Sequence, residues 1–256
     1  MNKTGISWTD LTWNPVSGCD KVSPGCQNCY AEAWSHRWNR SFKVQLHPEK
    51  LKEVKRIPPG SKVFVNSMSD LFHPVVPTTF INEVFAAIRS RPDVIFQILT
   101  KRPEEINLRI PRLHPIPRNV WLGISVELRM YWFGRRDELI KTGWKYGEYH
   151  GHHGIKFVSF EPLLGDIGKI KFAHLPFEKG INWIIIGGES GPHHRPMNIE
   201  WARNLVTQAK EQGVKVWMKQ LGGLHPGGSI CDFPEDLRIQ EFPMPILLPM
   251  AKEESL

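Results

Sequence analysis

The stretch Trp183-Ile184-Ile185-Ile186-Gly187-Gly188-Glu189-Ser190 joins a run of bulky apolar residues to a polar, glycine-rich turn. Such a run predicts a strand that is buried on both faces, which is typical of a parallel sheet covered by helices. Five further segments have the same character: Lys62 to Asn66, Val94 to Leu99, Val120 to Ile124, Ile155 to Phe160 and Val214 to Met218. We therefore expect an α/β protein built around a parallel sheet.

Helical patterns lie between some of these strands. Phe80, Val84 and Ile88 form one apolar stripe, and a second helix is predicted from Asn198 to a stop at Gly213. Strand and helix alternating in this way permit either a closed or partial barrel or an open doubly wound sheet, since parallel crossovers are right-handed in both.

Polar residues follow the predicted strands, and we expect them to surround one site. In parallel α/β folds, ligands bind at the carboxyl ends of the strands. The turns concerned are Ser67 to Asp70, Thr100 to Arg102, Ser125 to Glu127, Glu161, and Gly187 to Ser190.

The chain of 256 residues is long enough for one large domain, which we place at residues 1–232. Residues 233–256 read as a Pro-rich C-terminal extension, and residues 131–154 as an irregular insertion. No apolar run approaches the roughly 20 residues that cross a bilayer, and no secretory signal is recognisable, so we expect a cytoplasmic protein without a membrane partner. The net charge of +7 is compatible with a polyanionic partner.

Three of the four cysteines lie within eleven residues: Cys19, Cys26 and Cys29. They follow a predicted first strand, Ser7 to Asn14, and precede a predicted helix that starts at Tyr30. Three thiolates can hold an iron-sulfur cluster with one iron left open, or zinc with His36 or Cys231 as the fourth ligand. Their place on the first strand-to-helix loop of a large α/β unit favours the iron-sulfur cluster.

The combined motifs resemble those of the phage-associated three-cysteine-motif proteins, which stand near the radical S-adenosylmethionine (SAM) superfamily. More remotely, the cysteine placement is similar to that in spore photoproduct lyase, a DNA-repair member of that superfamily. The resemblance rests on Cys19 to Ala31, Ser67 to Phe72, Leu99 to Pro103, Ser159 to Leu163, Gly187 to Gly191 and Met218 to Gly222.

The resemblance implies a partial, (β/α)6-type TIM-like barrel that carries a [4Fe-4S] cluster and SAM. It also implies an external electron donor such as flavodoxin or ferredoxin. Two departures stand out: the first cysteine gap is six residues instead of the usual three, and Gly-Gly-Glu follows a later strand than is usual in that superfamily.

Chemistry suggests roles for the polar turns. A bound methionine zwitterion needs one partner of each sign, so Ser69 and Asp70 are candidates for its ammonium, and Lys101 or Arg102 for its carboxylate. Ser125 and Glu127 are candidates for the ribose. The remaining candidates are Ser67, in the same turn as Asp70, and Gly187 and Gly188 for close approach of a ligand. Of Glu161 and Glu189, we expect one to face the cavity; the alternative for either is to bond backbone amides of its own loop.

Aromatic residues beside arginines suggest contact with nucleic acid. Trp34 and Trp38 lie beside Arg37 and Arg40, and the densest group is Tyr131, Trp132, Phe133, Arg135 and Arg136. His193, His194 and Arg195 are candidates for a phosphate or substrate contact.

The expected function is that of a radical SAM enzyme. It would abstract hydrogen from an unidentified substrate, with DNA, RNA or a nucleotide as candidates. The alternative is a non-catalytic, zinc-stapled nucleic-acid-binding protein.

Overall fold

The computed structural model describes residues 2–109, 116–142, 144–145, 148–149, 154–173, 180–225 and 229–243. Its main sheet contains eight strands in the order β1-β2-β5-β6-β7-β10-β11-β12. Their bounds are Asn2–Lys3, Leu11–Trp13, Lys62–Val65, Ile95–Thr100, Val120–Ser125, Lys156–Phe160, Trp183–Gly187 and Lys215–Gln220. All neighbours are parallel except β1, which pairs antiparallel with β2.

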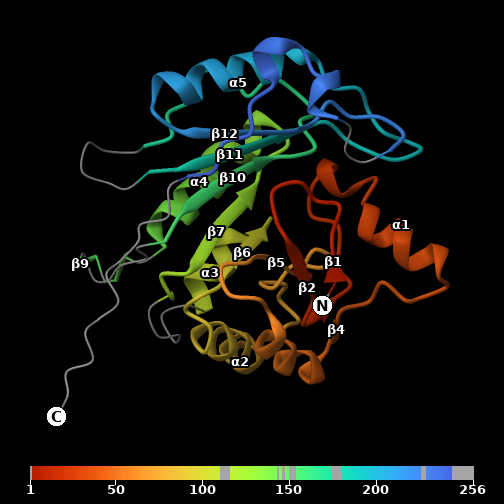
Figure 1. Ribbon diagram of the computed structural model, residues 1–256, viewed down its shortest axis with the longest axis vertical. Helices are drawn as coiled ribbons and strands as arrows, with labels where there is room; N and C mark the ends of the chain where they lie inside the picture. Colours follow the sequence, from red (N-terminus) through yellow and green to blue (C-terminus); the bar gives the residue numbers. More distant parts are fainter. Residues whose placement is uncertain are drawn as a thin grey trace.

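The strand order distinguishes between the two architectures that alternating elements allow. In a doubly wound sheet the order reverses at a switch point. Here each parallel strand lies beside the parallel strand that precedes it in the chain, and the outer strands β1 and β12 are not paired with each other. Figure 1 shows the resulting curled, open sheet. The predicted partial barrel is confirmed.

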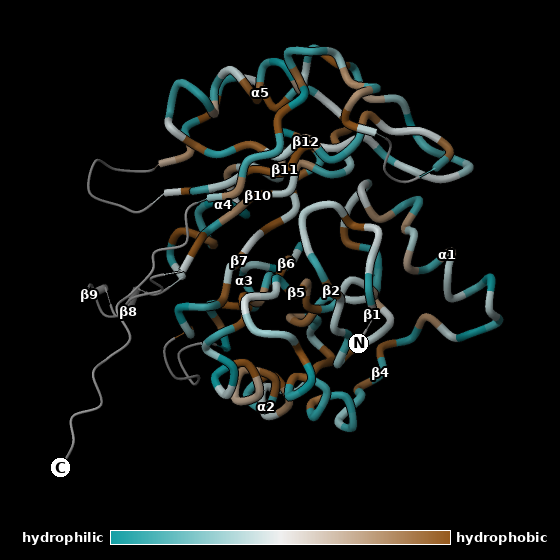
Figure 2. Tube along the Cα trace, in the orientation of Figure 1, coloured by the Kyte–Doolittle hydropathy of each residue, from teal (hydrophilic) through white to brown (hydrophobic). Residues whose placement is uncertain are grey.

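Four of the described helices cover the outer face of the curled sheet: α2 (Thr78–Arg89), α3 (Pro103–Arg109), α4 (Arg129–Lys141) and α5 (Ile199–Glu211). Helix α1 (Tyr30–Arg37) lies to the side of the barrel, and Ala31 is its buried residue. Alternate strand residues such as Val63 and Val65 share one large core with Ile81 of α2 and Leu205 of α5. Figure 2 shows hydrophobic stretches, coloured brown, within the sheet and on helix α2.

The inner face of the sheet is filled by aromatic rings at the amino ends of the strands. Trp121, Phe157, Trp183 and Trp217 belong to one separate apolar cluster together with Trp8. Toward the carboxyl ends, the same side of strands β7 and β10 carries Ser125 and Ser159 instead. The aromatic cluster therefore closes the amino end of the partial barrel and leaves the polar side chains at the carboxyl end.

Shorter elements complete the described chain. The strand pairs β3 (Val16–Ser17) with β4 (Gln45–Leu46), and β8 (Trp144–Lys145) with β9 (Glu148–Tyr149), form two small antiparallel sheets. The 3-10 helices are η1 (Pro24–Cys26), η2 (Pro48–Arg56), η4 (Ile230–Asp232) and η5 (Glu235–Leu237). No helix within the described ranges is long and apolar enough to span a bilayer.

The interpretation of residues 131–154 as an irregular insertion is wrong for its first part. Residues 129–141 form helix α4, which follows β7 as a regular member of the barrel. Its buried side carries Arg135 and Arg136 beside Trp132 and Leu139, so the sequence lacks a clean apolar stripe. Residues 143, 146–147 and 150–153 lie outside the described residues.

The start of the predicted C-terminal extension packs on the barrel. Phe233 and Leu237 are buried in the outer core. The backbone of Ile239 and Glu241 hydrogen-bonds to Met218 and Val216 of β12, and Phe242 joins the inner aromatic cluster. Residues 233–243 thus extend the packing beyond residue 232, while residues 244–256 lie outside the described part of the chain.

Candidate active site at the cysteine loop

The segment from Gly18 to Cys29, which we call the cysteine loop, connects the first parallel strand β2 to helix α1. Cys19, Cys26 and Cys29 are all half-buried free thiols; Cys26 ends η1, and Cys29 is the N-cap residue of α1. The fourth cysteine, Cys231, is exposed in η4. The predicted position of the triplet on the first strand-to-helix connection is confirmed.

Gly18 fixes the start of the cysteine loop. Its N–H donates to Met68 O at 3.1 Å, and the N–H of Cys19 donates to Phe42 O at 3.1 Å. Gly18 has a φ of +79°, and a Cβ there would lie 2.2 Å from the backbone oxygen of Lys43. Only glycine fits this position, because any side chain would collide with main chain that cannot rotate away.

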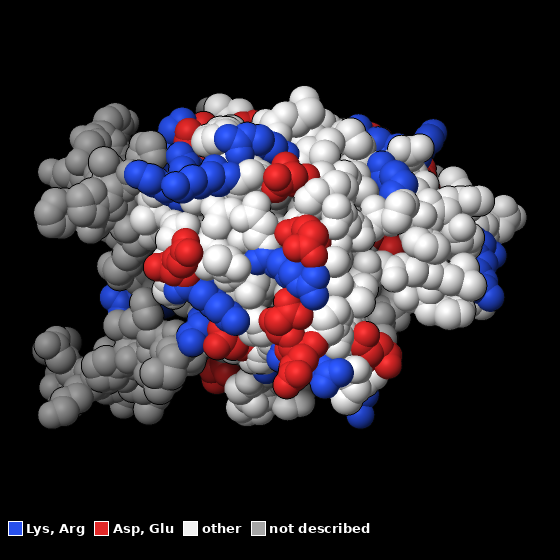
Figure 3. Space-filling model, turned by 90° about the horizontal axis from the view of Figure 1, so that it is seen from above, with Lys and Arg blue, Asp and Glu red and all other residues white. Residues whose placement is uncertain are grey.

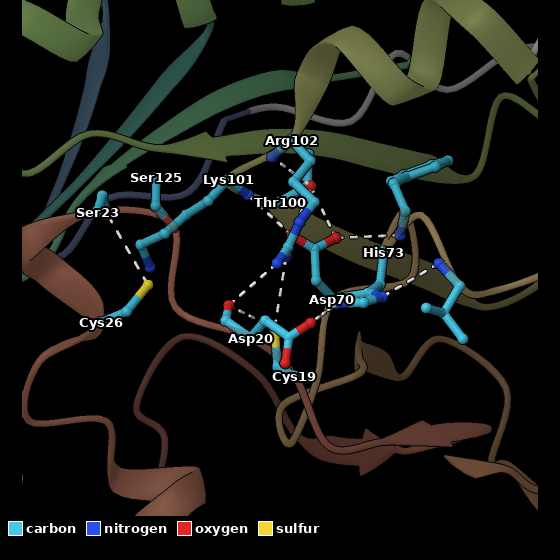
Figure 4. A network of polar contacts seen from close by, with 12 residues as sticks. Cys19, Asp20, Ser23, Cys26, Asp70, His73, Thr100, Lys101, Arg102 and Ser125 are labelled. Carbon is cyan, nitrogen blue, oxygen red and sulfur yellow. Dashed lines mark hydrogen bonds and ion pairs between the residues drawn. The ribbon is translucent and has the colours of Figure 1, made fainter. Parts of the chain in front are cut away.

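Arg102 connects the turn after β6 to Cys19 (Figure 4). Its Nη1 donates to Cys19 Sγ at 3.4 Å and to Asp70 Oδ2 at 3.1 Å, and its Nη2 donates to Asp20 O at 3.0 Å. Arg102 and Asp70 are each about 5% exposed, so both charges depend on these contacts. The predicted neighbours Asp70 and Arg102 are thus brought together beside the first cysteine.

Both oxygens of Asp70 are already hydrogen-bonded. Oδ1 accepts from Phe72 N at 3.0 Å and from Thr100 Oγ1 at 2.7 Å, while Oδ2 accepts from Lys101 N and Arg102. A ligand ammonium would have to displace one of these donors to reach the carboxylate. The geometry therefore gives Asp70 the role of positioning Arg102, and its contact with methionine stays a prediction.

Burial and Arg102 act in opposite directions on the Cys19 thiol. Burial is the larger effect and raises the pKa of Cys19, whereas the hydrogen bond and charge of Arg102 lower it. A cationic donor at the sulfur favours the thiolate, which is the form that binds metals. Beside this pair, the imidazole of buried His73 contacts Asp20 Oδ2 at 3.0 Å. The backbone N–H of Val75 donates to the other ring nitrogen, so the neutral ring carries its proton on the side of Asp20.

Glu189 and Arg195 hold the other side of the cysteine loop. Glu189 Oε2 accepts from Asn28 Nδ2, Arg195 N and Arg195 Nε, each at 2.9 Å. Arg195 Nη2 continues to Pro24 O at 3.0 Å. Burial raises the pKa of Glu189, but the hydrogen bonds from Arg195 and Asn28 outweigh it, so the pKa is lowered overall. Arg195, considered above for phosphate, thus contacts Glu189 and the cysteine loop.

Glu127 lies directly beneath the cysteine loop. A Cβ on Gly25 would come within 3.1 Å of Glu127 Cγ, so the missing side chain lets the loop approach the turn after β7. Glu127 is fully buried, and its Oε2 accepts from Arg135 Nη1 at 2.8 Å. Its Oε1 is buried without a hydrogen-bond partner among the described residues. An unpaired buried carboxylate oxygen is costly, and Oε1 can still accept a hydrogen bond at this point beneath the cysteine loop.

Of the remaining predicted residues, Ser67 and Ser69 form hydrogen bonds within the protein, whereas the Lys101 side chain extends into the site. Ser67 O accepts from Tyr30 Oη, and Ser69 Oγ donates to Val16 O at 2.8 Å. Lys101 extends from β6 toward the Cys26 side of the site in Figure 4, and no hydrogen bond to its ammonium is found within the described ranges. Ser125 is buried near the same end of the sheet.

In the turns after β10 and β11, the predicted site residues contact other parts of the protein. Glu161 forms an ion pair with Lys219. A Cβ on Gly188 would lie 2.3 Å from Leu221 O, and one on Gly187 would make ordinary contacts with Glu161 and Gln220. The close approach at Gly188 is therefore explained by the neighbouring backbone, without a ligand.

The predicted nucleic-acid contact on α4 is wrong in its main members. Trp132 is completely buried, and Arg135 and Arg136 are only 8% and 7% exposed. Arg135 pairs with Glu127, and Arg136 pairs with Asp137. These residues look surface-like in the sequence because they are charged, but their charges are neutralised inside the protein.

The cysteine loop fits an iron-sulfur cluster in the number and kind of its donors. It offers three free thiols on one anchored loop, one of them already contacted by a cationic donor. Within the described ranges, however, no group of three or more His, Cys, Asp or Glu side chains is close enough to hold a metal ion. The thiols would have to converge to bind a cluster, and the same holds for a zinc site completed by His36 or Cys231.

Together, these observations define an α/β partial barrel with a three-cysteine loop anchored over the carboxyl ends of its strands. The family model described as "Protein of unknown function (DUF5131)" matches residues 3–242. The chain belongs to this family. None of the curated proteins matches the sequence significantly.

The chain is also similar to solved structures of spore photoproduct lyase. A cysteine-to-serine mutant of that protein has a TM-score of 0.49 and 11% identity, with 84% of this chain and 64% of the other covered. A mutant with bound AdoMet and dinucleoside spore photoproduct has a TM-score of 0.49 and 10% identity, covering 82% and 63%. The chain thus spans less than two thirds of the length of these structures.

Proposed function

We propose that the protein is a radical SAM enzyme whose Cys19, Cys26 and Cys29 hold a [4Fe-4S] cluster. When bound, such a cluster passes one electron to SAM, whose carbon-sulfur bond breaks into methionine and a 5'-deoxyadenosyl radical that abstracts hydrogen from the substrate. The observation that carries the proposal is the anchored loop of three free thiols at the carboxyl edge of a partial barrel.

The surrounding residues support this use of the loop by holding it in place. Arg102 donates to the sulfur of Cys19, and the Glu189–Arg195 pair fixes Asn28 and Pro24 on the opposite side. A loop fixed by charged contacts from two distant turns would keep its thiolates available to one cluster. The ammonium of Lys101 is our candidate for binding the methionine carboxylate.

Metal analysis of the anaerobically reconstituted full chain tests the proposal. We expect about four irons per chain and a broad absorbance near about 400 nm. Cys19→Ser, Cys26→Ser and Cys29→Ser should each lose most of this absorbance, while Cys231→Ser, a matched change of an exposed thiol, should keep it. A colourless protein that binds one zinc tightly would refute the cluster.

Product analysis tests the chemistry separately. With dithionite as the electron source in place of flavodoxin or ferredoxin, the reconstituted protein should convert SAM to 5'-deoxyadenosine. A clustered protein that leaves SAM intact under these conditions would contradict the enzymatic proposal. The substrate, with DNA, RNA or a nucleotide as candidates, and the phage association remain predictions.

A further inference from the structure

Helix α1 presents an unusual solvent-facing surface directly after the cysteine loop. Ala31 is the buried residue of this helix, while Trp34 and Trp38 are 57% and 59% exposed. The two side chains are four residues apart, and their ring centroids are 6.0 Å from each other. Two large exposed rings in contact form an apolar patch, and such patches commonly mark interaction sites.

The patch is surrounded by cations. His36 and Arg37 lie in the last turn of α1, and Arg40 and Lys43 follow it; all four are exposed. Within the described ranges, no ion pair engages Arg37, Arg40 or Lys43. The acidic residue of α1, Glu32, is already paired with Lys21 at 2.9 Å. The surface therefore combines exposed aromatic rings with uncompensated positive charge.

We infer that Trp34 and Trp38, with Arg37, Arg40 and Lys43, form a binding surface for single-stranded nucleic acid. Unstacked bases have flat faces that stack on indole rings, and the phosphates between them complement the arginines and the lysine. A protein partner with an apolar patch would not require this charge. This inference goes beyond the proposed chemistry and does not depend on the cluster.

The geometry of the two rings predicts how bases would bind. The planes are inclined at 54°, so the rings do not form a parallel slot for one base between them. Each ring instead offers its own face, which favours neighbouring bases of a flexible strand over the stacked bases of a duplex. These contacts involve the bases and phosphates and do not read the 2'-hydroxyl, so DNA and RNA strands should bind alike.

The position of α1 places this surface close to the candidate active site. Cys29 is the N-cap residue of the helix, and Trp34 follows five residues later. At about 1.5 Å per helical residue, Trp34 lies roughly 8 Å along the axis from Cys29. A strand of a few nucleotides bound to this surface is therefore long enough to reach the cysteine loop.

Fluorescence anisotropy with a labelled twelve-nucleotide oligothymidine tests the inference on the full chain. At low salt we expect binding that weakens steeply as salt rises, with an equal-length oligouridine binding similarly and a mixed-sequence duplex more weakly. The double variant Trp34→Ala/Trp38→Ala should bind at least about tenfold more weakly. Phe133→Ala, which removes an exposed ring from α4, should bind like the wild type.

A second set of variants, with a matched control, tests how much the arginine charges contribute to binding. Arg37→Gln/Arg40→Gln should reduce the slope of log affinity against log salt by about 1.4, while Arg89→Gln, at an exposed position on α2, should leave it unchanged. Melting curves of all variants should match the wild type, because these side chains are exposed.

Three results would overturn the inference: no binding of the oligothymidine by the wild type at low salt, wild-type affinity in the tryptophan double variant, or equal affinity for duplex and single strand. Failure to bind iron would instead refute the proposed cluster and leave this binding measurement valid.

Discussion

At the scale of single residues, Glu189 illustrates how a buried acid is kept charged. It is 5% exposed and receives three hydrogen bonds on one oxygen and the Arg195 guanidinium on the other. These donors lower its pKa despite burial. A group with a lowered pKa in the folded state stabilises that state above its unfolded pKa, and the contribution disappears as the pH falls through the folded value.

Glu189→Gln is therefore expected to show a pH-dependent loss of stability. At pH 7 the variant should be less stable by about 1–3 kcal/mol, because hydrogen bonds to a charged acceptor are replaced by weaker ones. The difference should shrink as the pH falls below about 4.3, the ordinary pKa of glutamate, because the unfolded wild-type chain then takes up a proton, and it disappears once folded Glu189 is also protonated. Urea unfolding at several pH values measures it.

Glu200→Gln is the matched control for this change. Glu200 also pairs with an arginine, Arg203, but its side chain is 65% exposed. Exposed pairs contribute only about 0–1 kcal/mol, so this variant should show little change at any pH. A Glu189→Gln difference that stays constant from pH 7 to pH 3 would contradict the assigned role of the charge.

The sequence predicts which residues lie at the candidate site, but it does not predict which of them contact one another. The sequence predicts Asp70, Arg102 and Glu189 because polar residues that follow apolar strands gather at one edge of a parallel sheet. That Glu189 binds Asn28 could not be predicted, because the two residues are 161 positions apart. Asp20 and His73 were missed; their signal was adjacency to Cys19 and to the turn after β5.

At the scale of elements, Gly134 and Gly188 differ in whether the surrounding structure leaves room for a side chain. Gly134 lies exposed in the middle of α4, with nothing within 4 Å of a Cβ, whereas a Cβ on Gly188 would meet the backbone of Leu221 at 2.3 Å. Gly134→Ala should stabilise the protein by about 0.5–1 kcal/mol, because alanine is the better helix former.

Gly188→Ala should destabilise the protein, because the turns after β11 and β12 must separate to admit the methyl group. Paired denaturant titrations measure both changes against the wild type. If Gly188→Ala were as well tolerated as Gly134→Ala, the close contact between these turns would be wrong.

Helix α4 also shows where prediction of elements from sequence fails. The six apolar strands were predicted within about two residues because they are uniformly apolar and lie between two covered faces. The first parallel strand, β2 (Leu11–Trp13), is shorter than the predicted Ser7 to Asn14. Helix α4 was missed because Arg135 and Arg136 interrupt its apolar stripe. Their charges are compensated by Glu127 and Asp137, a pairing that exists only in the folded protein.

At the scale of the whole molecule, charge is distributed unevenly. On the face above α5, Lys and Arg alternate with Asp and Glu, so the net charge of +7 is not expressed there as one basic surface (Figure 3). The uncompensated cations around α1 are thus a local feature, and the overall charge alone does not identify a binding face.

The aromatic cluster inside the sheet joins distant parts of the chain and should contribute strongly to its stability. The ring of Trp183 lies within 6.4 Å of five others, from Trp8, Trp121, Phe157, Trp217 and Phe242. Its Nε1 donates to Glu241 O at 2.8 Å. These contacts tie β11 to the N-terminal segment, to three strands and to residues 241–242 at once.

Trp183→Ala is expected to destabilise the protein by about 3–5 kcal/mol, because it removes a large buried ring and leaves a cavity. Trp183→Phe, which keeps an aromatic ring, should cost less and provides a folded variant if the alanine variant does not fold. The control is Trp34→Ala on α1, which should change stability by less than about 0.5 kcal/mol because the ring is exposed. Urea unfolding followed by near-ultraviolet circular dichroism would report both quantities. Equal losses for the Trp183→Ala and Trp34→Ala variants would contradict a barrel whose amino end is closed by packed aromatic rings.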